Sequence, residues 1–499
     1  MSNTHQSRPV RTAFSRQFLW GLMLVTLFAI FALYNMPGSK SYKDYLVEKE
    51  QKEAVKKTAT AEVPPDTSPL KSITQVSKDY SSPFKPFNIQ HWVNEQGARI
   101  YFVHAPEIPM LDVRLIFDAG AARDGDIPGL AGMVNSLLDE GTKNYNVDQI
   151  AQQFESLGAI FGASSHRDMG VLQLRTLSGD EWLSPALDLF TEILTYPSFP
   201  EENFERIRKL AILGLEYKEQ SPEAKIGDAL FQTLYPNHNY GILPDGTKAS
   251  LTNMTKENLI DFHQQYYVAK NMVIALVGDI SLEKAKSVAN QIAKDLPAGE
   301  PAAPLAKPDP LMASQRIHLD HPSTQTHVRI ATHGIQRGHP DHFALYVGNE
   351  ILGGGGFSSL LNKEIRQDRG LTYSVYSYFS PMRAAGPFVI GLATKTESTE
   401  EALTVVKETL NKFLTEGPTE EQLTKTKRSI INSFPLKMGS NGQIAGQLGA
   451  IGFYGLPLDY LDNYLAKIQA VTAEDVKAAM KKALEDSNML TITVGKAEI

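Results

Sequence analysis

Residues 254–278 read MTKENLIDFHQQYYVAKNMVIALVG, and residues 471–495 read VTAEDVKAAMKKALEDSNMLTITVG. Each stretch begins near a threonine suited to cap a helix, Thr255 or Thr472, continues through an amphipathic run and ends in an apolar strand that closes with Val-Gly. The helix, the Asn-Met turn and the strand recur at the offset that separates the two threonines. A Pro-Glu-Glu helix start near residue 200 recurs at nearly the same offset. These matches indicate an internal duplication.

A proline-rich break separates the two copies. Residues 297–310 read PAGEPAAPLAKPDP, and their five prolines exclude a continuous helix or a central strand. We therefore expect an N-terminal domain at 88–296, a linker at 297–310 and a C-terminal domain at 311–499. Two domains of similar size agree with the duplication and with a length of 499 residues.

Within each half, apolar strands alternate with amphipathic helices. In the first half we expect strands at residues 98–103, 111–118 and 171–176 and helices at 130–138, 148–157, 182–195 and 202–219. In the second half we expect strands at 326–332, 373–379 and 388–393 and helices at 343–352, 400–416 and 420–434. This alternation predicts an α+β fold of two homologous domains, each an antiparallel sheet with helices packed on one face.

The N-terminal segment predicts attachment to a membrane. Residues 18–34, FLWGLMLVTLFAIFALY, carry no charge; three arginines lie at 8–16, and charges of both signs follow. This asymmetry predicts a cytoplasmic N-terminus at 1–17, a transmembrane anchor at 18–36 in a bacterial inner membrane, and a polar tether at 37–87 that leads to a periplasmic body. The alternative is a cleaved signal peptide and a protein secreted to the periplasm.

The composition argues against some kinds of partner and excludes some kinds of chemistry. The formal net charge of −7 does not favour a nucleic-acid partner, and we expect none. The chain has no cysteine, which excludes disulfides, thiolate nucleophiles and Cys-ligated metals. Two His-x-Asp-His groups occur at 318–321 and 339–342. The second has Pro and Asp where a helix start favours them, and we interpret both groups as structural.

The stretch 129–142, GLAGMVNSLLDEGT, resembles the metal-binding helix of the insulinase, pitrilysin and mitochondrial-processing-peptidase family. That helix has the pattern G-L-A-H-x-x-E-H-x-x-x-x-G-T, and the frame agrees at both ends without a gap. Further similarity follows in order through the chain, notably at 352–355, 357–360 and 370–375. The resemblance covers residues 88–499, and it implies the duplicated metallopeptidase-like fold of the family.

The residues that carry the family's chemistry are changed. The resemblance implies two histidines four residues apart with a glutamate base between them, and here those positions hold Gly132, Asn135 and Ser136. Glycine and serine offer no zinc nitrogen, and an asparagine amide takes no proton from water. Catalytic zinc needs three protein ligands. The family's third ligand, a later glutamate, aligns with Glu205, and one carboxylate does not hold zinc. We therefore expect no metal or other cofactor in this chain.

One feature of the family is kept. The resemblance implies an arginine and a tyrosine, seven residues apart in the second half, that reach the zinc half of the site. The tyrosine donates to the developing oxyanion, and the arginine positions the substrate. Arg366 and Tyr373 have this spacing. The chain is thus expected to be inactive alone. It would supply both residues to a homologous subunit that holds the zinc. The substrate would be a peptide or an unfolded segment, and an exposed sheet edge could take it up as an added strand.

Three other interpretations stay open at this point. The first is a scaffold of this fold without a peptidase role, like the core subunits of the respiratory bc1 complex. Arg366 and Tyr373 would then be replaceable without loss. The second is a peptide-binding or chaperone-like module that acts alone. The third, an active lone protease, needs a metal site that the sequence does not provide.

Overall fold

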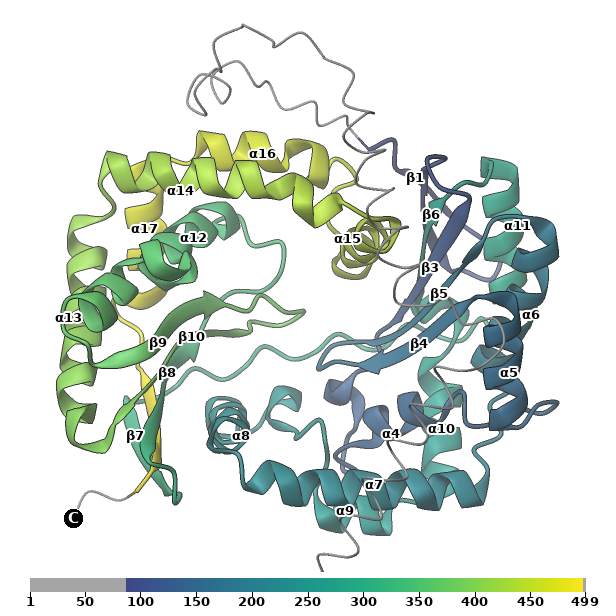
Figure 1. Cartoon of the computed structure of the whole chain (residues 1–499), viewed down its shortest axis with the longest axis horizontal. Coiled ribbons are helices and arrows are strands. Elements are labelled where there is room, and N and C mark those ends of the chain that lie inside the picture. Colours follow the sequence, from purple (N-terminus) through teal and green to yellow (C-terminus); the bar gives the residue numbers. More distant parts are fainter. Residues whose placement is uncertain (1–86, 497–499) are drawn as a thin grey trace, which may run out of the picture. The chain divides into compact units, whose positions relative to one another are not determined.

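The structure is a computed structural model that describes residues 87–496. Two sheets organise this part of the chain (Figure 1), one built from residues 90–278 and the other from residues 315–495. The predicted cytoplasmic segment, the anchor and all but the last residue of the predicted tether lie outside the described residues. Between residues 87 and 496, no helix is both long and apolar enough to cross a bilayer.

The first sheet has six strands. They are β1 (Gln90–Val93), β2 (Arg99–His104), β3 (Met110–Phe117), β4 (Ile160–Ser165), β5 (Gly170–Leu177) and β6 (Met272–Gly278). Their order is β1-β2-β6-β3-β5-β4, and neighbours are antiparallel except β2 and β6, which are parallel. Every residue of β6 is buried, as expected for an apolar strand in the middle of a sheet that is covered on both faces.

The second sheet repeats this arrangement. Its strands are β7 (Gln315–Asp320), β8 (Gln325–His333), β9 (Thr372–Phe379), β10 (Pro387–Lys395) and β11 (Leu490–Gly495). The order β7-β11-β8-β10-β9 matches β2-β6-β3-β5-β4 strand for strand, with the parallel pair, β7 and β11, in the same place. The predicted α+β class and duplication are confirmed. The parallel pair in each sheet is a detail that the prediction of an antiparallel sheet lacked.

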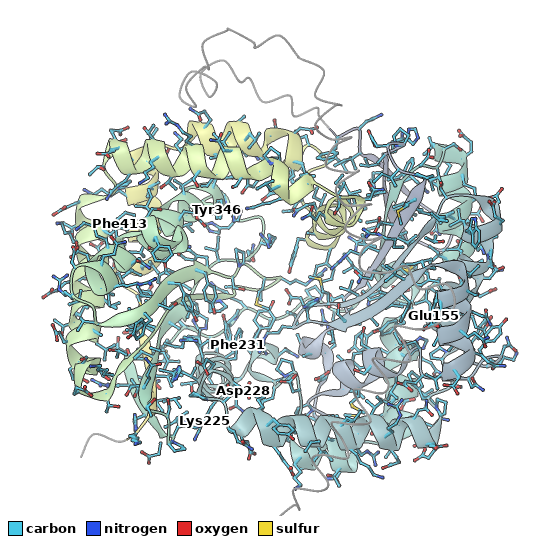
Figure 2. The ribbon with its side chains drawn as sticks, in the orientation of Figure 1. Glu155, Lys225, Asp228, Phe231, Tyr346 and Phe413 are labelled. Atoms are coloured by element: carbon cyan, nitrogen blue, oxygen red, sulfur yellow. The ribbon has the colours of Figure 1, made fainter. Side chains whose placement is uncertain are left out.

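The helices are distributed over both halves. The first half contains α4 (Leu130–Leu137), α5 (Val147–Leu157), α6 (Asp180–Thr195), α7 (Glu201–Glu219), α8 (Pro222–Leu234), α9 (Lys248–Asn253), α10 (Lys256–Tyr266) and α11 (Leu282–Ala293). The second half contains α12 (His342–Asn349), α13 (Thr399–Glu416), α14 (Glu420–Ser433), α15 (Asn441–Tyr454), α16 (Tyr460–Ala470) and α17 (Ala473–Leu484). These helices are largely amphipathic: Glu155 of α5 is exposed, whereas Phe413 of α13 is buried (Figure 2).

Matching caps begin the repeated helices. Thr255 and Thr472 each accept a hydrogen bond from the backbone N–H three residues later, and the side chain at that later position bonds back to the threonine N–H. This reciprocal capping box satisfies two backbone donors at each helix start. The sequence signal that indicated the duplication is therefore a local structural signal as well.

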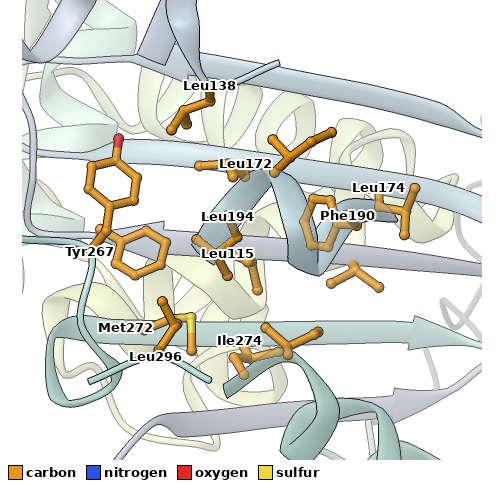
Figure 3. Close-up of a cluster of buried hydrophobic side chains, with 14 of the residues drawn as sticks. Leu115, Leu138, Leu172, Leu174, Phe190, Leu194, Tyr267, Met272, Ile274 and Leu296 are labelled. Carbon is orange, nitrogen blue, oxygen red and sulfur yellow. The ribbon is translucent and has the colours of Figure 1, made fainter. Parts of the chain in front are cut away.

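The largest apolar core lies between the first sheet and its own helices. Leu115, Leu172 and Ile274 project from β3, β5 and β6 toward Phe190 of α6 (Figure 3), and all four side chains are buried. Burying a large apolar side chain of this kind contributes about 1.5–3 kcal/mol. The core therefore fixes the register of the sheet against the helices that carry the site.

The other face of each sheet is covered by a helix from the opposite half. α15 packs across β2, β3 and β6 of the first sheet, and α8 packs across β8 and β11 of the second. Gly452 of α15 allows the close approach, because a Cβ there would lie 2.5 Å from the ring of Tyr101. Each half thus completes the burial of the other, so the helices are not confined to one face.

Candidate functional site

A buried carboxylate holds the start of α4. Gly129, just before the helix, adopts a left-handed conformation with φ of 90°. Asp124 accepts hydrogen bonds from the backbone N–H groups of Gly129 and Ala131, each at 2.7 Å. These bonds satisfy donors that a helix start leaves without partners. Burial raises the pKa of Asp124 to about 7, although the same hydrogen bonds lower it.

Helices α4 and α7, with residues 244–245 and Leu251 of α9, line an open cavity of about 470 Å³. Gly132 and Ser136, one helical turn apart on α4, form part of its wall. The α7 side is mostly aliphatic and is formed by Ile207, Leu210, Ala211, Gly214, Leu215 and Lys218. Across residues 87–496, no group of three His, Cys, Asp or Glu residues is placed to hold a metal ion. The two positions that the sequence resemblance aligns with the family's histidines therefore meet here in a mostly apolar space.

The charged groups of this cavity compensate one another. Lys218 lies 2.6 Å from a carboxylate oxygen of Asp245, which also lines the cavity, and 2.8 Å from one of Asp228. The two carboxylates raise the pKa of the Lys218 ammonium against the opposing effect of burial. Lys218 therefore stays charged and paired at neutral pH, and it offers no basic nitrogen to a metal.

Asn135, which the sequence resemblance aligns with the family's catalytic base, points into the core and does not line the cavity. Its side-chain amide donates hydrogen bonds to the hydroxyl of Tyr267 at 2.7 Å and to the carbonyl of Ala131 at 3.2 Å. The residue is 3% exposed, and its side-chain oxygen has no partner among the described residues. Asn135 therefore joins α4 to the segment after α10, which is a structural task.

Glu205 and Gly214 show which face of α7 is turned toward the cavity. Glu205 does not line it; its carboxylate lies 2.6 Å from Arg208, which also donates to the carbonyl of Met254. Gly214 lies nine residues later, two and a half helical turns away, and it does line the cavity. The sequence alignment that selected Glu205 missed Gly214. The row of Ile207, Ala211 and Gly214 at helical spacing was the signal that could have indicated it.

Arg366 and Tyr373 lie on adjoining elements of the second half. Arg366 belongs to a π-helical turn, Asn362–Gln367, that packs against β9, and Tyr373 is the second residue of that edge strand. Tyr373 is 82% exposed. The guanidinium of Arg366 lies 4.5 Å from the ring centroid of Phe357, itself exposed. Within the described residues, no hydrogen bond joins the pair or occupies the Tyr373 hydroxyl. Both polar ends are therefore available to a molecule outside the chain.

Comparison with known proteins places this geometry in a family. A family model described as insulinase (peptidase family M16) matches residues 99–243, and one described as the peptidase M16 inactive domain matches residues 253–430. A solved structure described as a peptidase M16 inactive domain from Pseudomonas fluorescens is 43% identical. The similarity covers 82% of this chain and 98% of that one, with a TM-score of 0.80.

More distant relatives carry both active and inactive names. An uncharacterized zinc protease, YmxG, of Bacillus subtilis is 24% identical over 81% of this chain and 98% of its own length. A non-peptidase homologue, also named YmxG, of Helicobacter pylori is 26% identical over 81% of this chain and 92% of its own. Within the part of the chain that the structure describes, the α4–α7 cavity has no set of three metal-ligating side chains, which agrees with the relative named as a non-peptidase homologue.

Proposed function

The chain belongs to the insulinase family, peptidase family M16, as a non-catalytic peptidase-like member, and on that premise we propose that it acts as the second subunit of a heteromeric zinc endopeptidase. In this proposal a homologous partner holds the zinc ion, and this chain supplies Arg366 and Tyr373 to peptides bound between the two subunits. The observation that carries the proposal is a contrast within one molecule. The positions aligned with the family's zinc ligands on α4 line a mostly aliphatic cavity, whereas the Arg366–Tyr373 pair is kept and neither side chain makes a hydrogen bond within the described residues.

Each of the two residues has a separate task in this proposal. Metal chemistry, the polarisation of the carbonyl and the activation of water, comes from the partner. The Tyr373 phenol donates a hydrogen bond to the carbonyl oxygen as negative charge develops there. Arg366, held over Phe357, orients the peptide by pairing with its carbonyl or carboxylate groups. The surface of α7, where Leu210 and Tyr217 are more than half exposed, offers apolar area that a partner or substrate would cover.

The decisive experiment compares Tyr373→Phe with wild type in the reconstituted pair. The substitution removes one exposed hydroxyl, so the fold should be unchanged, and turnover should fall about a hundred- to thousandfold. Tyr376→Phe, on the same strand, is the matched control and should keep full activity. Arg366→Ala should raise KM more than it lowers kcat. If Tyr373→Phe stays within about twofold of wild type, the scaffold interpretation replaces the proposal.

We also propose that residues 18–36 anchor the protein in a bacterial inner membrane with its body in the periplasm. The support is the uncharged run at 18–34 after three arginines. A reporter that is active only in the periplasm should be active when fused after residue 60, and the protein should sediment with membranes. Recovery of the mature protein in the soluble periplasmic fraction would indicate a cleaved signal peptide.

A further inference from the structure

A second cavity, of about 480 Å³, lies in the second half where α12, α15, α16 and the end of β9 meet. Its walls are rich in aromatic and aliphatic side chains, among them Tyr346, Phe379, Ile451 and Tyr460. A π-helical turn, Glu350–Gly354, follows α12 at one side, and such turns often occur at functional sites. The cavity size suits a small ligand or one large side chain with its backbone. Neither Arg366 nor Tyr373 lines it.

Arg337 provides the principal polar group of this cavity. Its backbone N–H donates to the carbonyl of Met382 at 2.8 Å, which fixes the loop after β8. Its guanidinium lies 5.3 Å from the ring centroid of Tyr454 and, among the described residues, pairs with no carboxylate. The Nε atom is buried and without a hydrogen-bond partner. A buried donor that stays unsatisfied is unfavourable, so the chain itself leaves the hydrogen-bonding capacity of Arg337 incomplete.

The other titratable groups leave the charge of Arg337 uncompensated. Burial raises the pKa of Glu350, and the positive charge of Lys437 opposes this shift. Glu350 therefore interacts with Lys437. Burial lowers the pKa of His342 to about 4, with smaller contributions from Arg337 and His339, so His342 is neutral at pH 7. The cavity lining contains two cations, Arg337 and Lys437, and one carboxylate, Glu350, so its net charge is positive.

We propose that this cavity binds a carboxylate that carries an apolar body. Arg337 pairs with the carboxylate through two N–H groups, which its planar guanidinium presents in the matching geometry. The aromatic walls take the apolar part, where ring contacts are favourable. The C-terminal residue of a peptide and a free apolar acid share this chemistry. Binding here needs no zinc-bearing partner, so the inference is independent of the function proposed above.

The test measures ligand binding to the full chain in detergent. The probes are a fluorescent tetrapeptide that ends in phenylalanine with a free carboxylate, the same peptide with a C-terminal amide, and 3-phenylpropionate as competitor. We expect the amide to bind about ten- to hundredfold more weakly than the acid, the range for loss of a charge-assisted hydrogen bond. Arg337→Gln should weaken binding of the peptide acid by a similar factor and leave binding of the peptide amide unchanged.

Two further variants make the result specific. Arg337→Lys keeps the charge and should restore part of the affinity. Arg369→Gln removes an arginine of the same half that pairs with Glu364 outside the cavity, and it should bind like wild type. Competition by phenylpropionate at an affinity equal to that of the peptide acid would assign the site to free acids. Equal binding of acid and amide, or unchanged binding by a folded Arg337→Gln variant, would overturn the proposal.

Discussion

The two cavities lie at comparable places of a duplicated fold and have opposite chemistry. In the first half, α4 follows β3 and meets α7; in the second half, α12 follows β8 and lies near the end of α14. The first cavity is aliphatic, and Lys218 is neutralised by two carboxylates. The second is aromatic and contains Arg337 without a carboxylate partner. Duplication therefore preserved the backbone frame, while the side chains of each copy set its chemistry.

Restoring ligands to the first cavity should produce the largest change. Wild type should contain no stoichiometric zinc after dialysis against a weak chelator. The triple variant Gly132→His, Ser136→His, Gly214→Glu should bind about one zinc ion per chain, measured by elemental analysis, because all three positions line one cavity and three protein ligands suffice. Space is available, since a Cβ at Gly132 would lie 3.4 Å from the nearest atom, the carbonyl oxygen of Pro244.

The matched control keeps Gly214 and changes only the two α4 positions. Glu205 is still present in that double variant, but it pairs with Arg208 on another face of α7. The double variant should therefore bind zinc far more weakly than the triple variant. Equal zinc content in both would show that Glu205 swings into the cavity and that the distinction between Glu205 and Gly214 is wrong.

The next largest difference between the two halves should be in how the free energy of unfolding depends on acid pH. His263 is the eighth residue of α10, and the eighth residue of α17 is the buried Met480. His263 donates to the carbonyl of Leu194 at 2.8 Å. Burial lowers its pKa from 6.5 to about 4, and the Leu194 carbonyl opposes that shift. Between these values the unfolded chain binds a proton that the folded chain excludes, so stability falls as pH falls from about 6.5 to 4.

The substitution His263→Met gives the first copy the residue of the second. In wild type, the free energy of unfolding should fall between pH 7 and pH 4.5. In the variant, urea unfolding should show a fall that is smaller by about 2–3 kcal/mol. Lys286→Met, an exposed change in the first half, should leave that loss intact. An unchanged pH dependence in His263→Met would mean that other groups cause the acid sensitivity.

Sequence reasoning succeeded where the signal is local and failed where it depends on the three-dimensional arrangement. The caps at Thr255 and Thr472 and the apolar run of β6 are readable because a few neighbouring residues determine them. The changed residues of α4 could be proposed from the sequence because they stand in a gap-free motif. The facing of Gly214 depends on how α7 is rotated about its axis, and an alignment that shifts by a few residues reverses it.

The second cavity and the exchanged helices were not predicted at all. Arg337 comes from a loop, Tyr460 from α16 and Ile451 from α15, and no spacing in the sequence shows that they meet. The crossing of α15 and α8 to opposite sheets is equally hidden, because an apolar helix face does not specify which sheet it covers. The predicted division at 297–310, which carries neither helix nor strand, gives no sign of this exchange.

Substitutions in the exchanged helices α15 and α8 should give the smallest effects, and they test how closely each helix packs. α15 approaches its sheet closely at Gly452, where an added Cβ would lie 2.5 Å from Tyr101 and 2.6 Å from Val273. A ring and a β-branched side chain yield little, so Gly452→Ala should destabilise the protein by about 1–3 kcal/mol. Gly446→Ala on the same helix meets nothing within 4 Å and should stabilise it by about 0.5–1 kcal/mol.

The corresponding change on α8 distinguishes helix propensity from packing. Gly227 of α8 also has open space at its Cβ, so Gly227→Ala should behave like Gly446→Ala and not like Gly452→Ala. Thermal unfolding of the three variants, each compared with wild type, measures the differences. Agreement of Gly227→Ala with Gly446→Ala would show that the cost of Gly452→Ala comes from its contact with β2 and β6. If Gly452→Ala were as stable as Gly446→Ala, Tyr101 and Val273 would have to move at little cost, and the idea of a glycine-dependent crossing would be wrong.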